Sequence, residues 1–103
     1  MTDATESFLI EADADTASAV QSHIESLTPG AASLSERRNF DGSEPTWIVI
    51  AQLSAQMLPA VLTFITSLRG PRLPRKLKIG EVEIENPTES DIELALARYS
   101  PDG

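Results

Sequence analysis

Hydrophobic residues occur along the chain in short blocks separated by turn-forming stretches. The first block, Ser7 to Ala12, is an apolar run that ends at acidic residues and predicts a buried strand. Asp15 or Thr16 then provides an N-cap for a short amphipathic helix, which Thr28-Pro29-Gly30 ends. The apolar positions of this helix, at helical spacing, are Ala17, Val20, Ile24 and Leu27.

The pattern weakens between Ala31 and Phe40, where Leu34 is the only large aliphatic residue before Phe40. The charged stretch Glu36 to Asn39 favours an exposed or edge strand that runs into a turn at Asp41-Gly42.

The segment from Trp47 to Leu68 has no charged residue over 22 positions and is followed by basic residues, as in a transmembrane span with a positive flank. Its polar positions, however, recur at spacings of four, three, four and three, which would place them on one narrow stripe of a helix. They are Gln52, Gln56, Pro59, Thr63 and Thr66. A lipid-facing helix needs no such stripe, so we favour a helix packed on a protein core. A membrane span, and a helix whose wide apolar face docks onto a partner, remain the alternatives.

Pro59 divides this segment, because proline lacks the donor that the preceding helical turn needs. The β-branched run Ile48-Val49-Ile50 therefore favours a strand, followed by a helix capped near Ser54. A continuous helix from Thr46, kinked at the proline, is the competing assignment.

The segment from Lys76 to Glu85 alternates apolar and charged residues on both sides of Gly80-Glu81, as in a two-residue hairpin. In this register Ile79 lies opposite Val82 and Leu77 opposite Ile84 on the buried face. Lys78 then meets Glu83, and Lys76 meets Glu85, on the outer face.

After Asn86-Pro87, Thr88 is predicted to cap a last helix that ends near Tyr99, because an acid follows it three residues on. The apolar face of this helix consists of Ile92, Ala95, Leu96 and Tyr99. The chain is thus predicted to be a single α+β domain over residues 1–103, a small sheet with two or three helices. If Ile48 to Ile50 is a strand, the order is a ferredoxin-like βαββαβ with an added strand and a C-terminal helix.

Charge is unevenly distributed along these 103 residues, which carry a formal net charge of -8. Residues 1–36 hold seven acids and no Lys or Arg, whereas five basic residues fall within the ten positions from Arg69 to Lys78. Such a basic connector is either simply solvated or attracts another copy or an oppositely charged partner. The absence of cysteine and of a basic-then-apolar amino terminus favours a cytoplasmic protein.

Candidate chemistry is sparse. The single histidine, His23, lies beside the apolar stripe of the first helix, where a surface or boundary residue is expected. A serine nucleophile would need this histidine as its base, and no residue that would orient the histidine is visible. Glu11, Asp13 and Asp15 suit capping and solubility better than metal binding, because no glycine-bearing calcium loop accompanies them. We therefore expect no enzyme activity, no cofactor, no metal and no small-molecule substrate. Nucleic-acid binding is disfavoured because the basic cluster has no interleaved aromatic residue and the rest of the chain is acidic.

The second half of the chain resembles the effector-associated constant component, a small domain of bacterial conflict systems. The resemblance rests on the apolar helix Leu58 to Leu68, the basic connector after it, and the hairpin Leu77 to Glu85 that leads into the final helix. Pro71 and Pro74 interrupt a connector that is more often densely basic in this family. The resemblance implies a non-catalytic adaptor that couples effectors to signalling components through protein contacts and that self-associates.

The leading hypothesis is accordingly a protein–protein interaction module of the adaptor or assembly type. A stoichiometric inhibitor or immunity protein, which covers a basic site on a target, and a membrane-associated protein anchored by residues 47–68 are the alternatives. The predicted partner-binding residues are Arg69, Arg72, Arg75, Lys76, Lys78, Gln52, Gln56 and Thr63.

Overall fold

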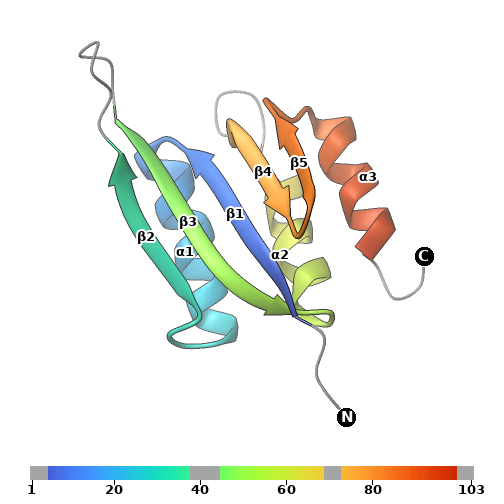
Figure 1. Cartoon of the computed structure of the whole chain (residues 1–103), viewed down its shortest axis with the longest axis horizontal. Helices are drawn as coiled ribbons and strands as arrows, with labels where there is room; N and C mark the ends of the chain where they lie inside the picture. Colours follow the sequence, from blue (N-terminus) through green and yellow to red (C-terminus); the bar gives the residue numbers. More distant parts are fainter. Residues whose placement is uncertain (1–4, 38–44, 69–72, 100–103) are drawn as a thin grey trace.

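A computed structural model describes residues 5–37, 45–68 and 73–99 of the chain. These residues form one antiparallel sheet with strand order β2-β3-β1-β4-β5 and three helices (Figure 1). The predicted α+β class is therefore confirmed. The first six elements follow the order βαββαβ, with β5 and α3 added after them. Figure 1 shows α1 and α2 behind one face of the sheet and α3 beside its β5 edge.

Strand β1 (Thr5–Ala12) is a central strand that pairs with β3 on one side and β4 on the other. Its alternate residues Phe8, Ile10 and Ala12 are fully buried against the helices. Helix α1 (Ala14–Leu27) begins earlier than predicted. Asp13, and not Asp15 or Thr16, is the N-cap, because its Oδ1 accepts the Thr16 N–H at 2.9 Å.

Strands β2 (Ala32–Arg37) and β3 (Thr46–Ser54) pair antiparallel, and β2 is the edge strand that the weak pattern predicted. The predicted turn at Asp41-Gly42 lies outside the described residues. The prediction that Gln52 belongs to the polar stripe of a helix is therefore wrong, because β3 is a strand. Gln52 belongs to β3 and alternates with buried Ala51 and Leu53, so its exposure follows a period of two and not of 3.6.

Helix α2 (Met57–Thr66) begins just after β3, so the competing continuous helix from Thr46 is wrong. The N-cap is Gln56, which makes no side-chain capping bond, and not Ser54 as predicted. Ser54 still contributes just ahead of the helix, since its Oγ accepts the Met57 N–H at 3.3 Å. Pro59 lies in the first turn, where backbone N–H groups have no partner within the helix. The proline therefore fixes where the helix starts without costing a hydrogen bond.

Strands β4 (Lys76–Ile79) and β5 (Val82–Glu85) form the predicted hairpin in the predicted register. Gly80 occupies the first turn position with φ +59°, a conformation that glycine adopts at little cost. Leu77 and Ile79 are buried, whereas Val82 and Ile84 on β5 are only half-buried. The outer strand of the hairpin is thus incompletely covered.

Helix α3 (Glu89–Tyr99) is held at its start by a reciprocal cap. The Thr88 N–H donates to Asp91 Oδ2 at 2.9 Å, and the Asp91 N–H donates to Thr88 Oγ1 at 3.2 Å. Ile92 and Ala95 are buried, and Leu96 and Tyr99 pack partly buried against the core, as predicted. Among the described residues, none of the helices has the length and apolar character needed to cross a membrane.

Candidate functional site: a groove beside an open sheet edge

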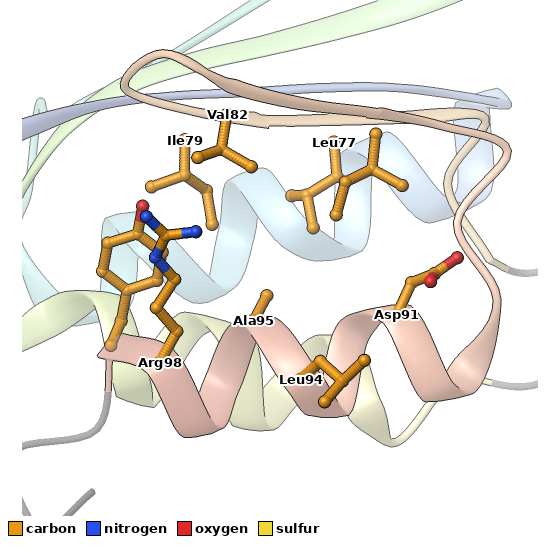
Figure 2. Close-up of a pocket in the computed structure, with 9 residues that line it drawn as sticks. Leu77, Ile79, Val82, Asp91, Leu94, Ala95 and Arg98 are labelled. Atoms are coloured by element: carbon orange, nitrogen blue, oxygen red, sulfur yellow. The ribbon is translucent and has the colours of Figure 1, made fainter.

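An apolar groove separates the β4–β5 hairpin from α3 (Figure 2). In Figure 2, Leu77, Ile79 and Val82 project from the hairpin toward the helix, and Ala95 faces them from α3. The remaining lining residues are Ile84, Asp91, Leu94, Arg98 and Tyr99. The groove exists because α3 packs mainly on α2 and leaves the half-buried side chains of β5 only partly covered.

The groove has a volume of about 160 Å³. An apolar cavity of about 150 Å³ accommodates a benzene molecule. The space therefore suits one aromatic or branched aliphatic side chain. Leu94 lies at its rim with 69% of its surface exposed, which makes it the most exposed large hydrophobic residue among those described.

The two ends of the groove carry opposite charges, both from α3. Asp91 lies near the start of the helix and Arg98 near its end, two turns later (Figure 2). The Arg98 guanidinium carbon also lies 6.0 Å from the centre of the Tyr99 ring. Binding pockets are commonly apolar with a small number of polar groups that orient the ligand, and the lining of this groove has that composition.

The β5 edge runs along this groove, and β4 is its only partner among the described strands. The Gly80 N–H donates to the Ser7 carbonyl oxygen at 2.8 Å, so by alternation Lys78 and Lys76 also direct their backbone groups to β1. The residues between them direct theirs to β5, which makes Leu77 with Ile84 and Ile79 with Val82 the hydrogen-bonded pairs of the hairpin. The Asn86 N–H, which donates to the Arg75 carbonyl oxygen at 2.7 Å, continues this alternation. The backbone groups of Glu83 and Glu85 must then point away from β4 toward the open edge.

Two local features place α3 where it forms the second wall of the groove. Asn86 has φ 50°, a left-handed conformation that asparagine tolerates better than most residues. It turns the chain from β5 toward buried Pro87 and the Thr88 cap. The wall of the groove thus depends on the turn at Asn86 and on the Thr88 cap, of which the cap was predicted from the sequence.

The sheet face opposite the helices carries an ordered row of charges. Glu11 on β1 pairs with Arg37 at 2.8 Å and with Lys76 at 3.4 Å, and Lys76 also lies 3.6 Å from Glu83. The hydrogen bond and charge of Glu11, and next the charge of Glu83, raise the pKa of Lys76. Lys76 is therefore a member of an internal network, and this lowers its availability to a partner.

The predicted partner-binding residues do not gather on one surface. Lys76, Lys78 and Gln52 share the open sheet face, where Gln52 donates to Ser7 Oγ at 3.2 Å. Arg75 is exposed at the start of β4, with Nη1 3.4 Å from Thr46 Oγ1. Gln56 and Thr63 are exposed at the start and in the middle of α2. Arg69 and Arg72 lie outside the described residues.

The groove itself was missed by sequence reasoning. Leu94 was the available signal, because it is a large aliphatic residue outside the predicted apolar face of the last helix. A large aliphatic residue next to a polar helix face is common on protein surfaces, however, and does not by itself indicate a site.

The remaining candidate chemistry is structural. His23 stacks on Phe64 with ring centres 4.5 Å apart, and its Nε2 atom is buried without a hydrogen-bond partner. Glu11 is engaged in ion pairs and Asp13 caps α1. Within the described parts of the chain, no three His, Cys, Asp or Glu side chains are grouped as metal ligands.

Comparison with family models, curated proteins and solved structures gives no match to this chain.

Proposed function

We propose that this chain is a non-catalytic protein–protein interaction module of the adaptor type and that the groove between the β4–β5 hairpin and α3 is its binding site. The observation that carries the proposal is the exposure of Leu94 beside the half-buried Val82 and Ile84, at the edge strand of the described sheet. A protein partner can satisfy both needs at once, because it brings apolar side chains and backbone donors and acceptors together.

The groove is smaller than the about 300–1,000 Å³ typical of small-molecule pockets, which favours a side chain of a protein partner as its occupant. Stable protein interfaces bury at least about 1,000 Å² in total, far more than a groove of this volume supplies by itself. The partner must therefore extend onto the neighbouring surface, which is the β5 edge. The resemblance of this hairpin and final helix to effector-associated domains supports the same role, that of coupling an effector to another component in bacterial defence.

The acidic edge also favours the second hypothesis, a stoichiometric inhibitor that covers a basic site on a target. Glu83 and Glu85 are exposed on β5 and would face such a target. The adaptor and the inhibitor would use the same binding surface and differ in their effect on the activity of the bound protein. An inhibitor silences its target when the complex forms, whereas an adaptor leaves the activity of its partner intact or raises it.

The test is affinity capture with the tagged full chain from extracts of its native cells, followed by binding measurements on the captured protein after purification. Leu94→Lys should abolish the interaction, because it places a charge at the rim of the apolar groove. Leu27→Lys is the matched control, since Leu27 is also a leucine in a helix with an exposed side chain (44%). Leu27 lies at the end of α1 and does not line the groove. Equal binding by both variants would refute the site.

The same purified complex separates adaptor from inhibitor. Light scattering gives its stoichiometry, and an assay of the partner alone and in complex shows whether the partner is silenced. Higher-order assemblies containing an active partner support the adaptor. A one-to-one complex with an inactive partner would replace it with the inhibitor.

A further inference from the structure

We infer that the partner binds as an extended segment that adds a sixth strand to the sheet at β5, and that this segment alternates apolar and basic residues. The inference rests on the proposed function and names the chemistry of the partner at the same site. Its grounds are the backbone of the edge, the two faces of β5 and the charges on them.

The backbone of β5 is already arranged for strand addition. The N–H and C=O groups of Glu83 and Glu85 point outward, and β5 pairs only with β4 within the described sheet. An added strand would continue the hydrogen-bonded ladder through these groups. Because both residues lie inside a regular hairpin, little ordering entropy opposes the docking of a strand.

One face of the added strand would cover the groove. On this face β5 presents Val82 and Ile84, and α3 extends beyond the sheet edge with Leu94 exposed (Figures 1 and 2). Side chains alternate across a strand, so every second residue of the partner would point into this apolar space. Those residues should be aliphatic or aromatic.

The other face of the added strand would lie beside Glu83 and Glu85. On the hairpin itself, Lys78 faces Glu83 and Lys76 faces Glu85 on the opposite side of the acids. A basic residue in the added strand would complete a row of alternating charge across three strands. An acidic residue there would lie next to a glutamate and weaken binding.

The same acids exclude a second copy of this chain at this edge. When the outward groups of Glu83 and Glu85 pair, two β5 strands related by a two-fold axis lie either with Glu83 opposite Glu85 or with one of the two glutamates opposite its own copy. Like charges then meet directly in both registers, which is a known protection of edge strands against self-pairing. The edge therefore accepts a basic strand and rejects its own copy.

The test uses isothermal titration of the full chain with three short synthetic peptides. The first alternates lysine with isoleucine and leucine, the second has the same composition with lysines and apolar residues in separate blocks, and the third alternates glutamate with the apolar residues. We expect binding of the first peptide only. Equal binding of the first two would show general charge attraction and would overturn the inference.

Three variants then locate the binding mode. Glu83→Gln combined with Glu85→Gln should weaken the first peptide by about 2- to 30-fold through the loss of two charge pairs. Glu93→Gln is the matched control, because Glu93 is exposed on α3 and does not line the groove. Glu83→Pro should weaken binding by about 2- to 10-fold, because it removes one outward donor.

Leu94→Lys distinguishes failure of the inference from failure of the proposed function. If Leu94→Lys abolishes partner binding while Glu83→Pro leaves it unchanged, the groove is the site but the partner is not an added strand. If neither variant changes partner binding, both proposals fail. Thermal unfolding of each variant confirms that the hairpin remains folded.

Discussion

The Asn86 N–H donates to the Arg75 carbonyl oxygen at 2.7 Å at one end of the hairpin, and at the other end the Gly80 N–H donates to the Ser7 carbonyl oxygen at 2.8 Å. With the pairing of β4 and β5, these bonds imply that Ile84 donates its N–H to β4 whereas Glu83 directs its N–H away from β4. The two neighbouring residues should therefore respond differently to proline.

Ile84→Pro removes a ladder hydrogen bond and a half-buried side chain, so we expect the free energy of unfolding to fall by about 2 kcal/mol or more. Glu83→Pro removes a donor that the hairpin does not use and should cost less. Urea denaturation of both variants measures the difference. A larger loss for Glu83→Pro would mean that the assignment of outward groups is wrong.

The reciprocal cap between Thr88 and Asp91 gives the second prediction. Thr88→Ala should lower the free energy of unfolding by about 1 kcal/mol, because the Asp91 N–H loses its acceptor. Ser90→Ala, an exposed change in the same first turn, is the control and should have little effect. Since the cap fixes the groove wall, Thr88→Ala should also weaken partner binding.

The two glycines with positive φ give the third prediction. A Cβ at Gly30 (φ 81°) meets nothing within 4 Å, whereas a Cβ at Gly80 (φ 59°) would lie 2.5 Å from Glu6 Oε2. Gly30→Ala should cost about 1–2 kcal/mol from backbone strain alone. Gly80→Ala should cost a similar amount in thermal or urea unfolding, because the Glu6 carboxylate is the far end of a flexible side chain and can move away from the new Cβ. Adding Glu6→Ala should leave the cost of Gly80→Ala unchanged, and a clearly larger cost at Gly80 that Glu6→Ala removes would contradict this prediction.

Glu25 provides a prediction for pH. Its carboxylate accepts the Gly30 N–H at 3.0 Å and the Ala32 N–H at 3.1 Å, and these bonds lower its pKa below the usual value for glutamate. The stabilisation is fully present above the pKa of the unfolded chain and is lost as pH falls through the lower pKa of the folded chain.

The comparison of Glu25→Gln with the unchanged protein tests this. The variant should be the less stable of the two at neutral pH, and the gap in the free energy of unfolding should narrow as the solution becomes strongly acidic. The measurement is chemical denaturation at a series of pH values. A gap that stays constant over the acid range would show that the charge of Glu25 makes no contribution.

The sequence was most informative where neighbouring residues decide the structure. The register of the hairpin followed from strict alternation around Gly80-Glu81, and the final helix followed from the spacing of Thr88 and Asp91. Local chemistry at these places leaves few alternatives. The strand order, by contrast, depends on long-range pairing between β1 and β3 and between β1 and β4. A local sequence pattern does not predict such pairing.

The wrong assignment of Gln52 and the missed groove also result from long-range contacts. Gln52 was placed on a helix because its spacing to Gln56 and Pro59 is compatible with a helical period, whereas pairing of β3 with β1 and β2 makes it a strand residue. The groove was not visible at all. It arises where α3 meets the hairpin, and the exposure of Leu94 beside the hairpin is a property of the tertiary structure.

Amide hydrogen exchange of the full chain, alone and with its captured partner, tests the central claim most directly. The N–H groups of Glu83 and Glu85 should exchange rapidly in the free protein and become strongly protected in the complex, while that of Ile84 is protected in both. Protection that appears on another surface, with Glu83 and Glu85 still exchanging rapidly in the complex, would contradict the account.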